Sequence, residues 1–137
     1  MKALITGING FVGYYLENAL QEKGIEVFGI DLEKRHKNVY EADLRDYKKT
    51  LQIIQEIKPD IVYHLAGVSR VDFKDPQILY DSNVNGSLNL LTGCIHLENL
   101  PKFIFISSSQ VYGLVSKQNQ PIDETFLVSP VNHYGAS

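Results

Sequence analysis

The sequence predicts an α/β fold in which a doubly wound parallel sheet is covered by helices on both faces. Short and almost wholly apolar segments recur at residues 2–6, 26–30 and 61–65. Segments with apolar residues at helical spacing separate them, and a glycine-rich turn follows the first segment. A strand with one face in water would alternate apolar and polar residues, so these strands are expected to be buried on both faces.

The first half of the chain is expected to alternate strands and helices. The expected elements are a strand over 2–6, a helix over 11–23, strands over 26–30 and 39–40, and a helix over 47–58. Gly24 suits a left-handed cap of the first helix, and Asp46 suits an amino-terminal cap of the second. The inner face of the first helix is expected to carry Val12, Tyr15, Leu16, Ala19 and Leu20.

The second half continues this alternation. The expected elements are a strand over 61–65, a long helix over 77–96, a strand over 102–107 and a helix that begins near His133. The long helix carries an apolar stripe that is expected to pack, formed by Val84, Leu88, Leu91 and Ile95. The single cysteine, Cys94, belongs to this stripe, so a packed thiol is expected rather than a reactive one.

The connections limit how the strands can be ordered. Right-handed crossovers allow the order 3-2-1-4-5 for this succession of elements. In such a sheet the direction of winding reverses between the first and fourth strands, and their carboxyl ends leave a crevice. A ligand is therefore expected at this edge of the sheet.

Composition and charge are ordinary for a globular protein. The chain has 137 residues, of which 44% are hydrophobic and 21% charged, with a net charge of −3. A chain of this size builds one core, and its negative charge disfavours nucleic acid and anionic membranes as partners. No membrane-spanning stretch or signal peptide is recognisable, so a cytoplasmic protein is expected. The histidines are scattered, and no metal site is expected.

The turn over residues 6–13 predicts a phosphate-binding site. It follows the first strand and opens the first helix, where glycine allows a tight turn and a close approach of the backbone to a pyrophosphate. The start of the helix adds free amide donors and a partial positive charge. The residues expected to bind a dinucleotide here are Gly7, Asn9, Gly10, Phe11, Val12 and Gly13.

Two acidic residues extend the expected cofactor site. Asp31 ends the second strand, where a carboxylate accepts hydrogen bonds from the adenosine ribose and repels the extra phosphate of NADP. NAD is therefore the expected cofactor, although Lys34 and Arg35 leave NADP open. Asp43, followed by Leu44, comes after the third strand. It is expected either near the adenine amino group or as a turn or capping aspartate.

The glycine spacing at 7, 10 and 13 is accompanied by four further segments, at residues 64–67, 83–86, 107–113 and 134–137. In this order the segments resemble the extended short-chain dehydrogenase/reductase family, the NAD-dependent epimerases and dehydratases. The resemblance covers the whole chain and implies a Rossmann-like domain over residues 1–137. It also implies further cofactor contacts from Leu65, Ala66, Gly67, Asn83 and Tyr134.

The resemblance implies how catalysis is arranged. In the family, hydroxyl groups at the positions of Ser108 and Tyr134 act on one sugar hydroxyl or carbonyl. A lysine is expected at position 138, where its ammonium would lower the pKa of the tyrosine. Residues 1–137 are therefore expected to be an incomplete domain that lacks a carboxy-terminal substrate domain, binds dinucleotide weakly and turns over no substrate. The full-length protein is expected to be a homodimer.

The resemblance also implies a reaction class. It indicates an epimerase or reductase of nucleotide-diphosphate sugars, nearest to the GDP-4-keto-6-deoxymannose reductases. Dehydratases of the family have glutamate at the position of Gln110, and an amide cannot accept the proton that such a base removes. A 4,6-dehydratase and a non-catalytic dinucleotide-sensing protein are the alternatives. Candidates for substrate contact, each also readable as an ordinary loop or surface residue, are Ser69, Arg70, Ser109 and Gln110.

Overall fold

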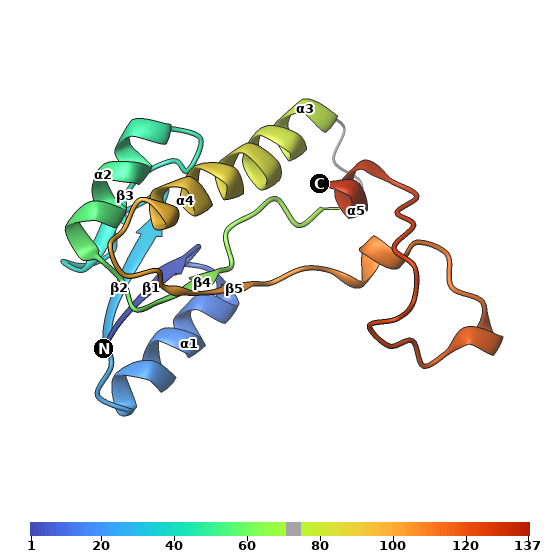
Figure 1. Cartoon of the computed structure of the whole chain (residues 1–137), viewed down its shortest axis with the longest axis horizontal. Coiled ribbons are helices and arrows are strands. Elements are labelled where there is room, and N and C mark those ends of the chain that lie inside the picture. The colour runs from blue at the N-terminus through green and yellow to red at the C-terminus, as the bar shows by residue number, and fades with distance from the viewer. Residues whose placement is uncertain (71–74) are drawn as a thin grey trace.

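The structure, a computed structural model, describes residues 1–70 and 75–137 (Figure 1). Its sheet has five strands in the order β3-β2-β1-β4-β5, and every neighbouring pair is parallel. The predicted strand order is therefore confirmed. The strands are β1 (Lys2–Thr6), β2 (Glu26–Asp31), β3 (Val39–Glu41), β4 (Ile61–His64) and β5 (Lys102–Phe105).

Helices cover both faces of this sheet (Figure 1). The helix α1 (Phe11–Glu22) lies on one face, while α2 (Tyr47–Ile57) and α4 (Gly86–Ile95) lie on the other. The predicted long helix is present, but it is built from α3 (Pro76–Leu79), a π-helical turn η1 (Tyr80–Asn85) and α4. The doubly wound architecture follows from these two layers of helices around one sheet.

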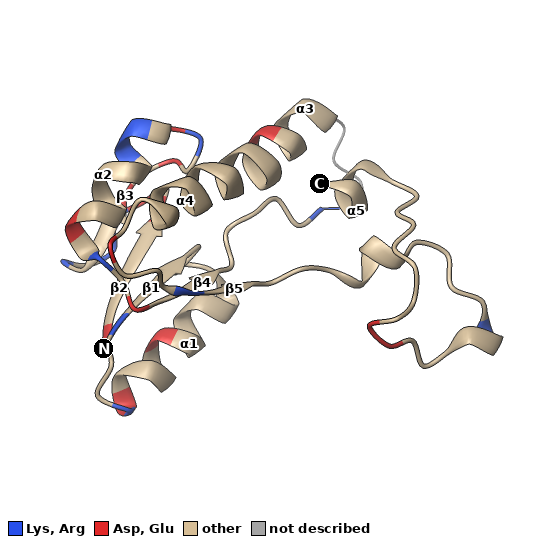
Figure 2. Ribbon diagram, viewed as in Figure 1, with Lys and Arg blue, Asp and Glu red and all other residues tan. Residues whose placement is uncertain are grey.

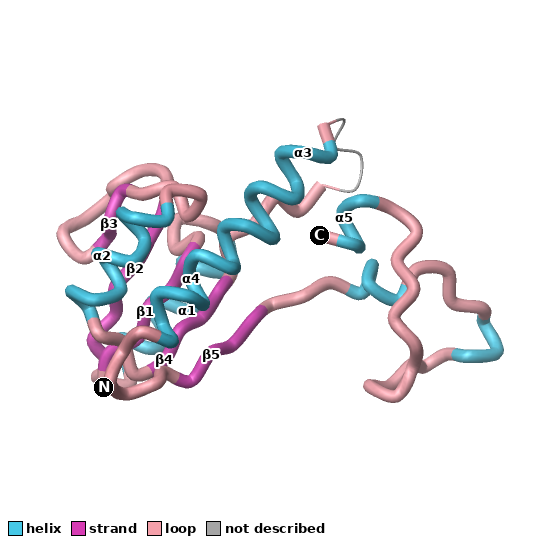
Figure 3. The backbone as a smooth tube through the Cα atoms, turned by 45° about the horizontal axis from the view of Figure 1, so that its top comes forward, coloured by secondary structure: helices cyan, strands magenta, loops and turns pink. Residues whose placement is uncertain are grey.

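The part of the chain after β5 leaves the sheet. Figure 3 shows this segment extending away from the strands and returning, so that the carboxyl end lies near α3. Its short helical elements are η2 (Ser109–Tyr112), η3 (Lys117–Asn119) and α5 (His133–Ala136). Tyr80 of η1 contacts His133 of α5, with ring centroids 5.9 Å apart. The turn that carries Tyr134 is therefore held against η1.

Strand pairing brings three chain segments to one edge. Thr6 at the end of β1 is level with Ile30 of β2 on one side and His64 of β4 on the other. Because parallel strands share their direction, their carboxyl ends meet at the same edge. The residues that follow, Gly7, Asp31 and Leu65, are therefore neighbours in space.

The core consists of two clusters separated by the sheet. One cluster joins the sheet to α2 and α4 and includes Leu4, Ile30, Ile54 and Leu90. The other joins the sheet to α1 and includes Ala3, Ile5, Leu20 and Val27. Strands whose side chains are buried alternately above and below account for the apolar runs in the sequence.

The expected inner face of α1 is wrong in part. Leu20 is buried, as expected, but Ala19 is exposed, Val12 is 58% exposed and Tyr15 is 60% exposed. The small residue Gly13 takes the inner position near the start of the helix. A Cβ at this position would collide with backbone carbonyl oxygens of the turn that precedes α1, so glycine is required on the inner side there.

The expected packing stripe on α4 is also wrong. Leu88 is 57% exposed and Ile95 is 65% exposed, and Val84 and Leu91 are exposed as well. The buried residues of this helix are Gly86, Ser87, Leu90, Gly93 and Cys94. Small residues let α4 approach its neighbours, because a Cβ at Gly86 would lie 3.3 Å from the Leu44 side chain. Figure 2 shows that α4 carries no charged residue on either face.

Cys94 is packed, as expected. Its thiol belongs to the core cluster on the α2 side of the sheet and is 4% exposed. Burial raises the pKa of the Cys94 thiol to about 11. The thiolate that would react is therefore scarce at neutral pH.

Two absences concern the described residues, 1–70 and 75–137. None of their helices combines the length and the apolar character needed to cross a bilayer. None of their histidine, cysteine, aspartate and glutamate side chains form a group of three or more that could hold a metal ion.

One histidine is buried in the sheet. His64 at the end of β4 is 2% exposed. Its ring contacts the hydroxyls of Thr6 and Ser87 and the rings of Phe103 and Phe105, all of which are uncharged. Burial therefore lowers the pKa of His64 from its ordinary 6.5 to about 4.

Stability should consequently fall in mild acid. Between pH 6.5 and about 4 the unfolded chain binds a proton at His64 that the folded chain does not, so this contribution is complete above pH 6.5 and lost on acidification. The loss should approach about 3 kcal/mol near the lower limit. Urea unfolding of the wild type and of His64→Gln, measured from pH 7.5 to 4.5, tests this. The difference in unfolding free energy between the two proteins should shrink as the pH falls, and a constant difference would contradict the prediction.

Candidate functional site

The turn between β1 and α1 is tightly built. Gly7 has a φ of 71°, its N–H donates to the Ile30 carbonyl at 2.9 Å, and its carbonyl accepts from Gly10 N–H at 3.0 Å. A Cβ at Gly7 would lie 2.9 Å from the Ala66 nitrogen, and one at Gly13 would lie 2.5 Å from the Ile8 carbonyl oxygen. Gly10 precedes α1 and contributes no side-chain cap. The first-turn amides are therefore open to an anionic ligand.

Asp31 is fixed beside this turn. Its Oδ2 accepts from the backbone N–H of Asn9 at 2.9 Å, and its Oδ1 accepts from that of Leu32 at 2.8 Å. The Asn9 side chain in turn donates to the Glu33 carbonyl at 2.7 Å. Each carboxylate oxygen has about two lone-pair sites, so Asp31 keeps capacity to accept bonds from a ligand hydroxyl.

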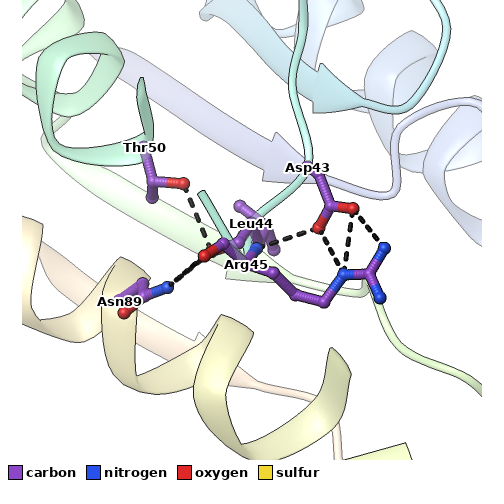
Figure 4. A network of polar contacts seen from close by, with 5 residues as sticks. All are labelled: Asp43, Leu44, Arg45, Thr50 and Asn89. Atoms are coloured by element: carbon purple, nitrogen blue, oxygen red, sulfur yellow. Dashed lines mark hydrogen bonds and ion pairs between the residues drawn. The ribbon is translucent and has the colours of Figure 1, made fainter. Parts of the chain in front are cut away.

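Asp43 lies in a polar network after β3 (Figure 4). The Arg45 guanidinium approaches both carboxylate oxygens, with Nη2 2.6 Å from Oδ2 and Nε 3.0 Å from each oxygen. The backbone N–H of Arg45 also donates to Oδ1 at 2.9 Å. The hydrogen bonds from Arg45 hold the pKa of the Asp43 carboxyl below its ordinary value. Asp43 is thus a turn aspartate whose charged form is stabilised.

Two other helices hold the same loop in place. The Leu44 carbonyl accepts from Asn89 Nδ2 of α4 at 2.9 Å and from the hydroxyl of Thr50 of α2 at 3.4 Å. Asn89 Nδ2 also donates to the Arg45 carbonyl at 3.2 Å. The backbone of residues 43–45 is therefore fixed before any ligand binds.

Nine of the cofactor residues expected from the sequence line one cavity of about 560 Å³, called here the first cavity. The expected residues on its wall are Gly7, Asn9, Gly10, Asp31, Asp43, Leu44, Leu65, Ala66 and Gly67. Arg45 and Ser82 also line it and were not expected from the sequence, and Arg35, which lines it too, was expected only as a ligand of the 2′-phosphate of NADP. For Arg45, the spacing Asp-x-Arg after a strand was a usable signal, since this pair often forms a local ion pair.

Phe11, Val12 and Gly13 line a different hollow. They share a cavity of about 220 Å³ with Gly7, Gly10, Leu65 and Ile106. Phe11 is 80% exposed there. The small cavity adjoins the first cavity, because Gly7, Gly10 and Leu65 line both.

The two expected catalytic hydroxyls lie on the same cavity of about 470 Å³, called here the second cavity. Ser108 and Tyr134 both line it, together with Asn83 and Ser69. The first and second cavities have residues 65–68 in common, which we call the shared segment. A ligand that occupies both cavities must pass over the shared segment.

The side chain of Asn83 holds the shared segment in place by hydrogen bonds to its backbone. Its Oδ1 accepts from the backbone N–H of Val68 at 2.7 Å, and its Nδ2 donates to the Val68 carbonyl at 3.2 Å. Nδ2 also donates to the hydroxyl of Ser137 at 3.0 Å. Asn83 lies inside η1 and is therefore not a helix cap. Its carboxamide joins the β4 loop to the turn that carries Tyr134.

Gln110 has a structural partner. Its Oε1 accepts from Asn132 Nδ2 at 3.2 Å, and Asn132 Oδ1 accepts from the Gly135 N–H at 2.7 Å. The Gln110 backbone N–H donates to Ser108 Oγ at 3.2 Å. Gln110 therefore connects the two turns that carry Ser108 and Tyr134.

Of the other candidates for substrate contact, one lines the second cavity and two do not. Ser69 lies on the second cavity and is exposed. Ser109 and Arg70 are exposed and do not line the first or second cavity. Ser69 is thus the member of this group that a ligand in the second cavity could reach.

The close contact at Gly7 predicts an unequal pair of mutants. Gly7→Ala and Gly24→Ala both place alanine at a positive φ, 71° and 72°, but a Cβ at Gly24 would meet no atom within 4 Å. Gly24→Ala should cost about 1–2 kcal/mol of unfolding free energy from backbone strain alone. Gly7→Ala should cost clearly more, because its Cβ would also push against Ala66. Urea denaturation measures both, and equal losses would contradict the close packing.

Comparison with known proteins supports the same arrangement. Residues 3–137 match the NAD dependent epimerase/dehydratase family. The chain is 35% identical to a GDP-mannose 4,6-dehydratase of Vibrio cholerae, over 99% of this chain and 42% of that protein. It is 33% identical to a GDP-6-deoxy-D-talose 4-dehydrogenase of Aggregatibacter actinomycetemcomitans, over 100% of this chain and 45% of that protein.

A solved structure agrees with the fold. The crystal structure of the Thermus thermophilus UDP-glucose 4-epimerase in complex with NAD superimposes with a TM-score of 0.89 and 29% identity. The match covers 99% of this chain and 47% of that one. The chain thus spans less than half the length of the relatives it matches. With its sheet order, its glycine turn and a family match along almost all of its residues, the chain belongs to the NAD dependent epimerase/dehydratase family.

Proposed function

We propose that the full-length protein is an NAD-dependent enzyme that transfers hydride at a sugar carbon of a nucleotide-diphosphate sugar, as an epimerase or a reductase. One observation carries this proposal. The first cavity, which suits a dinucleotide, and the second cavity, which holds Ser108 and Tyr134, meet along the shared segment. A cofactor lying across this segment has one end near the two hydroxyls.

The residues present fit a dinucleotide. Gly7 and Gly13 leave a cradle that a Cβ would fill, and α1 opens with free amides, which suits a pyrophosphate. Asp31 suits the adenosine ribose, and its negative charge favours NAD over NADP. Asp43 and the backbone of Leu44 lie on the same cavity and suit the adenine edge. Bound NAD would accept or return the hydride.

Ser108 and Tyr134 suit the proton chemistry of such a reaction. The Tyr134 hydroxyl, when ionised, takes the proton of a sugar hydroxyl, and in the reverse direction it donates one to a carbonyl. The Ser108 hydroxyl holds the same oxygen by a hydrogen bond. Gln110 supports their spacing through Asn132, which caps the turn of Tyr134.

Gln110 favours epimerisation or reduction over dehydration. Its carboxamide cannot accept a proton as a glutamate base does, and its oxygen is already bonded to Asn132. Relatives named GDP-mannose 4,6-dehydratase keep a dehydratase as the second candidate. Two of the relatives are named as enzymes of GDP sugars, which supports the narrower proposal of a GDP-4-keto-6-deoxymannose reductase. A non-catalytic dinucleotide sensor fits less well, because both hydroxyl residues line the second cavity.

Cofactor choice should depend on the charge of Asp31. In calorimetric titrations of the full-length protein, the wild type should bind NAD more tightly than NADP. Asp31→Asn should narrow this preference by about tenfold, because the repulsion of the 2′-phosphate is removed. Asp123→Asn is the control, since it removes the same charge from an exposed loop outside both cavities. An unchanged preference in Asp31→Asn would refute the assignment, and absence of binding to either dinucleotide would refute the proposed function.

Catalysis should depend on both hydroxyls. We expect Tyr134→Phe and Ser108→Ala in the full-length protein to lower turnover by about 10²–10⁴-fold while NAD still binds. Tyr47→Phe and Ser116→Ala remove hydroxyls from exposed positions away from both cavities and should leave turnover unchanged.

The same assay identifies the reaction. A panel of GDP-, UDP- and dTDP-sugars is tested while the absorbance of the reduced cofactor is followed. Lasting consumption of NADPH marks a reductase, and product formation without it marks an epimerase. Loss of water from the sugar would establish the dehydratase alternative instead. A homodimeric state and a cytoplasmic location stay predictions for the full-length protein, and light scattering tests the former.

A further inference from the structure

A continuous chain of hydrogen bonds joins the carboxyl ends of β1 and β4 to α4. Thr6 Oγ1 lies 2.6 Å from His64 Nδ1, and His64 Nε2 lies 2.8 Å from Ser87 Oγ. At one end the Ala66 N–H donates to Thr6 Oγ1 at 3.2 Å, and at the other the Ser87 hydroxyl donates to the Asn83 carbonyl. In the described part of the chain, every buried side-chain nitrogen and oxygen has such a partner.

The direction of every bond in this chain can be assigned. A carbonyl only accepts, so the single hydroxyl proton of Ser87 is committed to Asn83. Ser87 Oγ must then accept from His64, which places the proton on Nε2. A neutral imidazole has one N–H, so Nδ1 accepts from the Thr6 hydroxyl. Thr6 Oγ1 keeps a lone pair for the Ala66 N–H.

The two ends of this chain lie at the shared segment. Ala66, which is bonded to Thr6 at one end of the hydrogen-bond chain, is itself a residue of the shared segment. Asn83, at the other end, uses its side chain to hold both backbone groups of Val68, the last residue of the segment. Thr6 immediately precedes Gly7 of the phosphate turn. The imidazole therefore connects the end of β1, the start of the β4 loop and the π-helical turn η1.

We propose that His64, as the neutral Nε2–H tautomer, is a positioning residue. It holds the backbone of residues 65–68 in place between the cofactor and the catalytic hydroxyls. The proposal rests on the proposed function, because the segment matters through the dinucleotide that crosses it. His64 is 2% exposed and lines neither the first nor the second cavity. Its Nδ1 accepts a hydrogen bond from Thr6 while its Nε2–H donates one to Ser87, and a side chain with one polar atom cannot make both bonds.

The tautomer is tested first, by long-range proton–nitrogen spectra of the full-length protein at pH 7. The proton should be found on Nε2 of His64, and Nδ1 should show the shift of an unprotonated nitrogen. A proton on Nδ1, or on both nitrogens, would overturn the assigned bond directions and the proposal with them.

Positioning is tested by amide exchange at a distance. Ser87→Ala removes the acceptor of His64, and Thr6→Val removes its donor with little change of shape. Ser87→Ala should speed hydrogen exchange of the Ala66 amide by about tenfold, although Ser87 itself does not touch Ala66. Thr92→Val is the matched control, because the Thr92 hydroxyl also donates to a carbonyl four residues back in α4, that of Leu88. The contact of Thr92 with His96 is made by its backbone carbonyl and is kept in this variant. Unchanged exchange at Ala66 in Ser87→Ala would overturn the proposal.

Measurements of NAD binding distinguish a positioning role of His64 from a contribution to folding stability alone. Thr6→Val, at a residue outside the first and second cavities, should weaken NAD binding by about tenfold under conditions where the protein is folded. Val62→Ala serves as the comparison, since it removes buried volume from the same strand as His64 and lies outside the first and second cavities. Equal weakening of binding in Val62→Ala at equal loss of stability would reduce the role of His64 to stability and overturn the inference. If the wild type bound no NAD, the proposed function would fail, while the spectra and the Ala66 exchange would still decide the positioning role.

Discussion

The close approach of Gly7 to Ala66 is the constraint on which the rest of the molecule depends. A side chain at Gly7 would place its Cβ 2.9 Å from the Ala66 nitrogen, so the end of β1 and the loop after β4 meet backbone to backbone. This contact lies where the winding of the sheet reverses, and it lets α1 begin directly over the strand ends. The first and second cavities open on either side of it, with residues 65–68 as their common wall.

Polar side chains preserve this arrangement from several elements. Asp31 ties the phosphate turn to β2, Asn89 and Thr50 tie the loop after β3 to α4 and α2, and Asn83 ties the loop after β4 to η1. A bond to a loop backbone fixes position without filling space, so the cavities stay open. The apolar core supplies stability in two clusters around the sheet. The polar contacts at its edge supply the shape of the site.

The sequence allowed the sheet order and the wall of the first cavity to be predicted, because both depend on local patterns. Apolar strands, crossover handedness and a glycine turn suffice to bring Gly7, Asp31 and Ala66 together. The outward faces of α1 and α4 were misjudged because each helix carries apolar residues on its exposed side as well as on its packed side, and the small residues Gly13 and Gly93 decide which side packs. The Gln110–Asn132 pair was missed because a side-chain contact between two loops leaves no periodic signal, whereas Asp43 and Arg45 lie two residues apart and their spacing was a usable signal.

The edge of the sheet at β5 has a practical consequence for handling the polypeptide of residues 1–137. β5 is the terminal strand in the order, and Phe105 and the following Ile106 are 50% and 56% exposed. A strand edge with unpaired backbone groups and apolar side chains recruits strands from other molecules. Samples of this polypeptide should therefore be kept dilute and cold during purification, and self-association should be checked before any spectroscopic signal is assigned to a monomer.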